Sequence, residues 1–238
     1  MSKNKLRKFA EMETFERVFQ PEFEEVFNRD FRLKGQWARS VFDNGHPVLL
    51  ELGCGKGEYT TGLAERYPGK NFIGVDIKGA RIWKGAKTAN ECSLENVAFL
   101  RTRIELIESF FGPAEVDEIW ITFPDPQLKR RRNKKRLTGP RFLNRYRSFL
   151  KDHGIVHLKT DNDVMFRYTA QLARHNGLEI LAETDDLYHS EILDELLSIQ
   201  TTYEKQFLSE GSSINYIAFR LPRNNVITDL PEDDNHEG

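Results

Sequence analysis

The sequence predicts an α/β fold, with a mostly parallel sheet that carries helices on both faces. Short apolar runs typical of buried strands alternate along the chain with stretches of helical length, and this alternation is typical of such a sheet. At 238 residues the chain also suits one domain with appendages and a sizeable core.

Local patterns place the individual elements. Residues 48–52 form a short, continuous apolar run that ends in glycines, which predicts a buried parallel strand. The helix expected at 58–67 is closed by Pro68 and Gly69. Further strands are expected at 71–75, 97–100, 118–123, 154–159, 178–181 and 216–220, and further helices at 80–92, 140–151, 164–176 and 201–207. For the last two strands the sequence leaves an antiparallel edge open.

One main domain is expected over residues 46–222, between two appendages. Residues 223–238 form an acidic C-terminal tail. Residues 1–45 form an N-terminal extension that we expect to be partly helical, because apolar residues recur there at helical spacing: Phe15, Val18, Phe19, Phe23, Val26 and Phe27.

Composition favours a cytoplasmic protein that does not enter a membrane. No apolar run approaches the ~20 residues that a membrane helix needs. The basic N-terminus is not followed by the apolar stretch of a secretory signal. Cys54 and Cys92 suggest reduced thiols, and neither they nor the six histidines show metal-ligand spacing, so we expect no metal.

A glycine-rich turn, Glu-Leu-Gly-Cys-Gly-Lys-Gly at 51–57, follows the first of these strands. Its glycines permit a tight turn and a close approach of backbone to ligand. The spacing is neither the Gly-x-Gly-x-x-Gly of dinucleotide-binding folds nor a P-loop. Glu51 would repel a pyrophosphate and favour a cation, and Asp76 ends the next strand, where it can accept hydrogen bonds from ribose hydroxyls. The alternative is a glycine turn without a ligand.

Positive charge is concentrated at residues 129–136, where seven of the eight side chains are cationic in a chain of net charge −2. This basic run comes three residues after Phe-Pro-Asp-Pro at 123–126, a turn that ends an apolar strand. Such a patch attracts a polyanion, and nucleic acid is the first candidate. A solvated loop or a localisation signal is the alternative.

These features occur in the order seen in a known family. The glycine turn and Asp76 resemble those of class I S-adenosylmethionine methyltransferases. Pro-Asp-Pro at 124–126, the basic run, Thr-Asp-Asn at 160–162 and Thr-x-x-Glu at 201–204 followed by Phe207 resemble bacterial tRNA (guanine-N(7)-)-methyltransferases. The resemblance spans about residues 48–220. It implies a Rossmann-like class I methyltransferase fold, S-adenosyl-L-methionine as cofactor, and tRNA as partner, with residues 46–222 as the methyltransferase domain.

The resemblance also implies an activity and a role for each matched residue. The activity is methyl transfer to nitrogen 7 of guanosine in tRNA, at position 46 of the variable loop. The implied catalytic residue is Asp125. The implied cofactor-binding residues are Glu51, Gly53, Gly55, Gly57, Asp76 and Asp125. The implied substrate-binding residues are Lys129, Asp161, Thr201, Thr202, Tyr203 and Glu204. The implied RNA-binding residues are Arg131, Arg132, Asn133, Lys134, Lys135 and Arg136.

The chemistry agrees with these residue types. Nitrogen 7 of guanine has a lone pair and no proton, so its methylation needs no strong general base, and orientation supplies much of the acceleration. The ring becomes cationic, so carboxylates such as Asp125 and Asp161 can orient it and stabilise its charge. Turn capping is the alternative for these two aspartates, and helix capping is the alternative for Thr201 and Glu204.

Two positions depart from the family pattern. Gln127 stands where the family usually has Trp after Pro-Asp-Pro. Arg103 and Ile104 stand where the family usually has Asp or Asn followed by Ala, so the adenine-side contact is not carried over. Glu105 is a candidate substitute for that contact.

The sequence leaves other function classes as alternatives. An amino-methylating nucleic acid enzyme usually has an aromatic residue after its Pro-Pro pair to stack a flipped base, and Gln127 is not aromatic. Arg103 favours a catalytically silent RNA-binding module with a remnant cofactor loop. A nicotinamide oxidoreductase is disfavoured by the glycine spacing and by the lack of a Tyr-x-x-x-Lys pattern.

Overall fold

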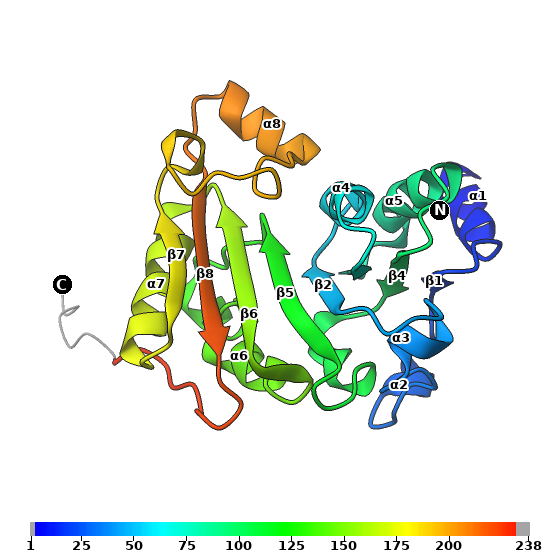
Figure 1. Ribbon diagram of the computed structural model, residues 1–238, viewed down its shortest axis with the longest axis horizontal. Coiled ribbons are helices and arrows are strands. Elements are labelled where there is room, and N and C mark those ends of the chain that lie inside the picture. The colour runs from blue at the N-terminus through cyan, green and yellow to red at the C-terminus, as the bar shows by residue number, and fades with distance from the viewer. Residues whose placement is uncertain (1–2, 232–238) are drawn as a thin grey trace.

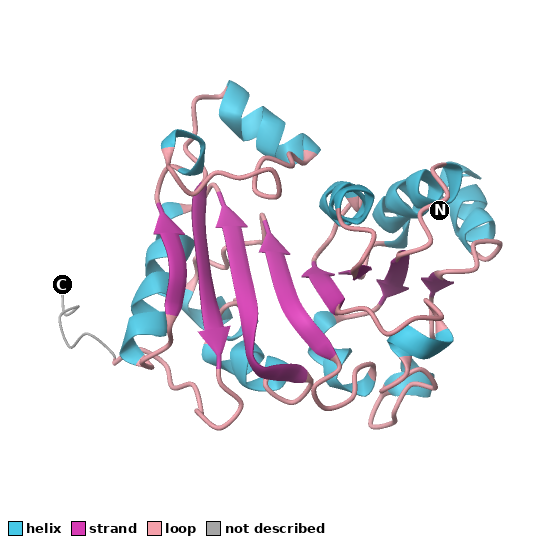
Figure 2. Cartoon of the chain, viewed as in Figure 1, coloured by secondary structure: helices cyan, strands magenta, loops and turns pink. Residues whose placement is uncertain are grey.

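The structure, a computed structural model, describes residues 3–231 and builds them around one twisted sheet (Figures 1 and 2). The strand order is β1-β4-β3-β2-β5-β6-β8-β7. Neighbouring strands from β1 to β6 pair in parallel, whereas β8 is antiparallel to both β6 and β7. The strands are β1 (Val18–Phe19), β2 (Val48–Leu52), β3 (Asn71–Asp76), β4 (Val97–Arg101), β5 (Val116–Thr122), β6 (Leu150–Thr160), β7 (Ile180–Thr184) and β8 (Asn215–Leu221).

Helices cover both faces of the sheet. The α-helices are α1 (Lys3–Met12), α2 (Phe23–Val26), α3 (Trp37–Ser40), α4 (Glu58–Arg66), α5 (Gly79–Glu91), α6 (Pro140–Tyr146), α7 (Asp163–His175) and α8 (Thr202–Ser209). The 3₁₀ helices are η1 (Ile104–Ser109), η2 (Arg130–Lys135) and η3 (Leu187–His189). Figure 1 shows α1, α4 and α5 together above the β1–β4 half, with α2 and α3 below it. Helices α6 and α7 lie behind β5–β8, and α8 lies above them.

Within the described residues, 3–231, two apolar clusters form the core, one on each face of the sheet. Leu49 belongs to the cluster beneath α4 and α5, and its neighbour Leu50 belongs to the cluster beneath α3, α6 and α7. This division follows from the strand backbone, because successive side chains point to opposite faces. All five residues of β2 are buried, as expected for a central parallel strand.

The chain order reverses between β2 and β5. Strands β3 and β4 lie on one side of β2, whereas β5 and β6 lie on the other. In open α/β sheets a ligand binds outside the carboxyl ends of the strands at such a switch point. This edge of the sheet therefore positions the candidate site.

The predicted fold class is confirmed, and the antiparallel edge that the sequence left open is present. The expected helical pattern at Val18 and Phe19 is wrong, because these residues form β1. The amide of Phe99 donates to the carbonyl of Arg17 at 2.8 Å, so β1 pairs an edge of β4 that would otherwise be open. The helix expected at 140–151 ends at Tyr146, since Leu150 already pairs with Val116.

Within residues 3–231 no helix is both long enough and apolar enough to cross a membrane. The same residues contain no group of three or more His, Cys, Asp or Glu side chains placed to hold a metal ion. The division into an extension, a main domain and a tail remains a prediction, and the tail lies outside the described residues from 232 onward.

Candidate active site at the carboxyl edge of the sheet

The glycine turn after β2 has a backbone that glycine suits best. Gly53, Gly55 and Gly57 have φ angles of 83°, 56° and 69°, which lie in the left-handed region. A Cβ on Gly57 would also come within 2.6 Å of the Phe99 ring. The turn is fixed to the next strand, because the amide of Gly55 donates to Asp76 Oδ2 at 3.0 Å. The glycines are thus required by the turn itself, and their predicted contact with a cofactor stays a prediction.

Glu51 lies beneath this turn with its carboxylate buried. Thr60 donates to Oε2 from its amide at 2.9 Å and also from its hydroxyl, and the Thr122 hydroxyl donates to Oε1 at 2.6 Å. Burial raises the pKa of Glu51 to about 7, although these donors favour the charged form. The carboxylate joins β2, α4 and β5, and its direct contact with a cofactor remains a prediction.

Asp76 ends β3 beside the turn. Its Oδ2 accepts from Gly55, and its Oδ1 accepts from the amide of Lys78 at 2.7 Å. Each carboxylate oxygen has further lone-pair capacity. The next residue, Ile77, is 49% exposed. Asp76 is therefore a half-buried acceptor at the strand end, next to an exposed apolar side chain.

The Pro-Asp-Pro turn leaves β5 at the same edge. Phe123 and Gln127, which flank it, have φ angles of 47° and 50°. A left-handed conformation is uncommon for a bulky side chain, and such strained residues cluster at functional sites. Asp125 is exposed, and its Oδ1 accepts from the amide of Gln127 at 3.0 Å. One carboxylate oxygen of Asp125 therefore caps the turn, as the alternative interpretation expected, and the side chain is exposed to solvent.

Asp161 follows the end of the neighbouring strand, β6. Thr122 of β5 is paired in register with Lys159 of β6, so Asp125 and Asp161 leave adjacent parallel strands a few residues apart. Burial raises the pKa of Asp161 above its usual value. These two carboxylates therefore sit at adjacent strand ends, one exposed and one half-buried.

Thr201 and Glu204 form a capping box at the start of α8. The Thr201 hydroxyl accepts from the Glu204 amide at 3.1 Å, and the Thr201 amide donates to Glu204 Oε2 at 3.3 Å. Glu204 is fully buried and pairs with Lys159 Nζ at 2.6 Å. Helix capping, one of the two alternatives, is thus present, and a contact of these two residues with substrate remains a prediction.

Sequence reasoning missed Lys159. Its ammonium group is buried on β6 and donates to the carbonyls of Leu197 and Ile199 as well as pairing with Glu204. Burial lowers the pKa of Lys159, and Glu204 opposes that shift. The sequence held one indirect signal for Lys159. Its partner Glu204 stands three positions after the capping threonine, Thr201, in a recognisable capping pattern.

Thr202 and Tyr203 connect α8 to the glycine turn. Thr202 donates to the carboxylate of Glu58, the first residue of α4, from both its amide and its hydroxyl. The Tyr203 ring has the cationic groups of Lys56 and Arg81 each 5.8 Å from its centroid. Tyr203 is exposed, so α8 presents an aromatic ring flanked by cations next to the turn.

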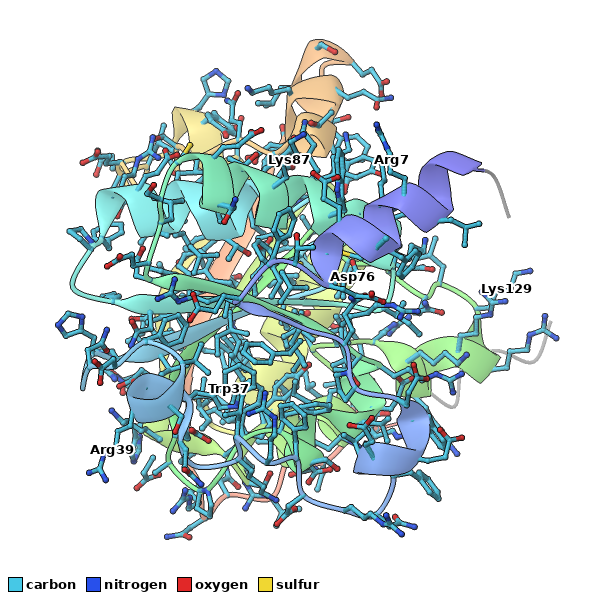
Figure 3. All side chains as sticks on the ribbon, turned by 90° about the vertical axis from the view of Figure 1, so that its right-hand side faces the viewer. Arg7, Trp37, Arg39, Asp76, Lys87 and Lys129 are labelled. Atoms are coloured by element: carbon cyan, nitrogen blue, oxygen red, sulfur yellow. The ribbon has the colours of Figure 1, made fainter. Side chains whose placement is uncertain are left out.

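The basic run forms η2 and the residues around it. Lys129, Arg131, Arg132, Lys134 and Lys135 are exposed, and Asn133 is half-buried. Arg136 differs from the expectation for the run, because it is only 8% exposed and its guanidinium group lies 4.3 Å from the centroid of the Tyr168 ring. In Figure 3, Lys129 and Asp76 lie toward the same side of the molecule, and Arg39 lies toward the other. The cations thus begin at the edge that carries the glycine turn.

Comparison with known proteins identifies relatives of the chain. A family model described as a putative methyltransferase matches residues 45–217. A tRNA (guanine-N(7)-)-methyltransferase of Christiangramia forsetii is 57% identical, over 92% of this chain and 99% of the relative. Another, of Bacteroides thetaiotaomicron, is 52% identical, over 95% of this chain and 89% of the relative. Among solved structures, the 16S rRNA methyltransferase KamB superposes with a TM-score of 0.59 at 14% identity, covering 77% of this chain and 92% of that one. This last likeness shows a shared fold.

Proposed function

Because the chain belongs to the tRNA (guanine-N(7)-)-methyltransferase family, we propose that it methylates nitrogen 7 of guanosine 46 in the variable loop of tRNA. S-adenosyl-L-methionine is the methyl donor. The observation that carries the proposal is the carboxyl edge, where the glycine turn, Asp76, Asp125 and Asp161 follow parallel strands. The free thiols of Cys54 and Cys92 support a cytoplasmic location.

The residues at the glycine turn fit this cofactor. When bound, S-adenosylmethionine supplies an activated methyl group on a positively charged sulfonium. The left-handed backbone at Gly53 has open space where a side chain would stand, so a ligand can approach the backbone there. Asp76 keeps acceptor capacity for ribose hydroxyls and adds the negative charge that a cationic ligand favours. Gly57, Glu51 and Asp125 complete the proposed set around the turn.

We assign Asp125 and Asp161 to the guanine. Their carboxylates accept from the donor edge of the base and hold nitrogen 7 toward the methyl group. As the bond forms, positive charge develops on the ring, and a partly desolvated carboxylate stabilises it more strongly than one in bulk water. Orientation and electrostatics therefore supply the acceleration, with no general base at nitrogen 7.

We assign the exposed cations of the basic run to the tRNA backbone. Contacts with phosphates position a nucleic acid without reading its sequence, so specificity comes from the shape of the tRNA. Lys129 stands closest to Asp125 along the chain and reaches the substrate nearest the reacting base. Thr202 and Tyr203 contact the substrate from the opposite side of the edge, on α8, with Thr201 and Glu204 holding that helix start.

The test is incubation of the protein with bulk tRNA and methyl-labelled S-adenosylmethionine, followed by digestion to nucleosides. We expect the label in 7-methylguanosine. Label in a base methylated at an exocyclic amino group would overturn the assignment of the reacting atom. No transfer by a folded protein that binds the cofactor would instead favour a silent RNA-binding module.

A further inference from the structure

A polar recess lies between α4, α5 and the start of α8 and measures about 300 Å³. Its cationic lining residues are Lys56, Lys84 and Lys205, and glutamates, threonines, glycines and one glutamine form the rest of its wall. Among the residues that the structure describes, no aliphatic or aromatic side chain lines it. Sites for small organic molecules are lined mostly by apolar side chains, so this recess suits a hydrated anionic group instead.

The three lysines come together only in the fold. Lys56 belongs to the glycine turn, Lys84 to α5 and Lys205 to α8. Figure 1 shows α4 and α5 above one half of the sheet and α8 above the other half, so the recess bridges the two halves near the switch point between β2 and β5. Because these lysines form no run along the chain, charge patterning in the sequence did not reveal them.

The carboxylate of Glu58 in the recess is already engaged. Its oxygens accept from the amide and the hydroxyl of Thr202, and Lys84 Nζ lies 3.6 Å from Oε1. Burial disfavours the charged form, but the bonds from Thr202 and the charges of the lysines outweigh it and hold the pKa of Glu58 below its usual value. Within residues 3–231 neither Lys56 nor Lys205 forms an ion pair. Their charges therefore remain available to a ligand.

An exposed aromatic ring stands beside the recess. The centroid of the Tyr203 ring lies 5.8 Å from Lys56 Nζ and 5.8 Å from the guanidinium carbon of Arg81. Glu65, the other acidic lining residue, is exposed, and Arg81 keeps cations in the majority around it. Cations that contact phosphates, next to an aromatic ring that can stack on a base, are the combination with which proteins hold unpaired nucleotides.

The recess and the basic run lie over opposite faces of the sheet. Arg136 of the run packs on Tyr168 of α7, and α7 covers one face together with α6. The recess lies between helices that cover the other face, α4 and α5. Lys56 follows β2 and the run follows β5, and both strands end at the carboxyl edge. An RNA whose base reaches that edge therefore meets cations on both sides of it.

We propose that this recess is a second phosphate-binding surface, in which Lys56, Lys84 and Lys205 hold the RNA backbone on the side of the guanosine away from the basic run. The inference rests on the proposed function and extends the RNA interface to the α4–α5 face of the sheet. Contacts of this kind position the RNA without reading its sequence.

The test combines Lys84→Ala with Lys205→Ala, which leaves the glycine turn intact. We expect weaker binding of tRNA and a slope of log affinity against log salt concentration that is lower by about 1.4–1.8, because each lost phosphate contact contributes about 0.7–0.9. Filter binding over a range of salt concentrations measures this. Calorimetric titration with S-adenosylhomocysteine should give an affinity within about twofold of that of the unsubstituted protein, as surface changes usually do.

The matched control combines Lys87→Ala with Lys151→Ala and removes the same number of charges. Lys87 lies on α5 outside the recess and pairs with Glu91, and Lys151 is exposed near the start of β6. We expect the slope of this variant to equal that of the unsubstituted protein, because exposed charges more than about 8–10 Å from a phosphate are largely screened. Unfolding temperatures report whether each variant is folded.

The outcomes separate the inference from the proposed function. A slope for the Lys84 and Lys205 variant equal to that of the control variant would show that the recess does not contact the RNA, and the proposed function would stand. A loss of affinity for S-adenosylhomocysteine with an unchanged slope would assign the recess to the cofactor and overturn the inference. An unsubstituted protein that binds no tRNA would overturn both.

Discussion

The buried carboxylate of Glu51 couples protonation to stability. Burial raises its pKa from its usual 4.5 to about 7, so the folded chain holds a proton that the unfolded chain has already released. The free energy of unfolding should therefore fall as the pH rises from about 4.5 to about 7. A shift of this size corresponds to about 3 kcal/mol.

Chemical denaturation of the protein and of Glu51→Gln at several pH values measures this effect. The glutamine variant keeps the shape and cannot titrate, so the difference between the two should change by about 3 kcal/mol over that window. Parallel curves of stability against pH would contradict the buried titration.

Asp125 is expected to act through its charge. Asp125→Asn keeps the acceptor for the Gln127 amide and removes the negative charge, so the fold should persist. We expect methyl transfer to slow by about 100-fold or more, the range for loss of one electrostatic contact to a transition state. Single-turnover kinetics with saturating tRNA measures this.

Asp152→Asn is the matched control for Asp125. Asp152 is also exposed, and its Oδ1 also accepts one backbone amide, that of Arg223 at 2.8 Å. It lies near the start of β6, at the end of the strand away from the site. If the Asp125 variant turned over as fast as the Asp152 variant, Asp125 would only cap its turn and would have no role in catalysis.

The positions of individual residues in the fold were predictable from the sequence where the residue type has few structural roles. Asp76 and Asp125 follow strands at the edge where parallel sheets bind ligands, so their placement followed from the strand pattern. The enclosure of Glu51 by Thr60 and Thr122 depends on side chains 9 and 71 positions away. No local pattern specifies such contacts.

At the scale of elements, α8 is held by a buried ion pair. Lys159→Met leaves the Glu204 carboxylate buried without its cation, which should destabilise the protein by about 3–5 kcal/mol. The double variant Lys159→Met with Glu204→Leu should lose less than the Lys159 variant alone, because no charge remains buried. Denaturant unfolding of the unsubstituted protein, the Lys159 variant and the double variant measures the effect.

Lys205→Met on the same helix is the control, since this lysine is exposed and should change stability by less than about 0.5 kcal/mol. A Lys159 variant as stable as the Lys205 variant would show that α8 does not depend on the pair.

The basic run should make tRNA binding more strongly dependent on salt concentration. Each phosphate contact contributes about 0.7–0.9 to the slope of log affinity against log salt concentration. Replacing Arg131, Arg132 and Lys135 by alanine should therefore lower the slope by about 2 to 3. Filter binding over a range of salt concentrations measures it.

Arg136→Met is the control from the same run. This side chain is buried against Tyr168, so its loss should lower stability and leave the slope unchanged. An unchanged slope in the triple variant would mean that the run is a solvated loop.

Elements were predictable where apolar runs are continuous and buried. β2 was expected at 48–52 and is found at Val48–Leu52. Periodicity was misleading at Val18–Phe19, because the open edge of β4 imposes a strand on two residues. The predicted end of α6 was wrong, because Leu150 pairs with Val116 in the sheet, and that contact is remote in sequence.

At the scale of the whole molecule, the order of the strands brings the site together. β4, β3, β2, β5 and β6 are adjacent and parallel, so the segments that follow them share one edge. Sequence alone predicted that these segments follow strands, and the resemblance to a family indicated that they act together. The approach of the N-terminal segment to this edge was not predictable, because residues 21–26 and 101–106 are remote in sequence and come together only in the fold, where they line one cavity.

The most direct measurement uses two tRNA transcripts that differ in one atom. One carries guanosine at position 46, and the other carries 7-deazaguanosine, in which carbon replaces the reacting nitrogen. We predict labelled methyl transfer to the first transcript and none to the second, with equal binding of both. Equal transfer to both would show that the methyl group goes to another atom and would contradict the proposed function.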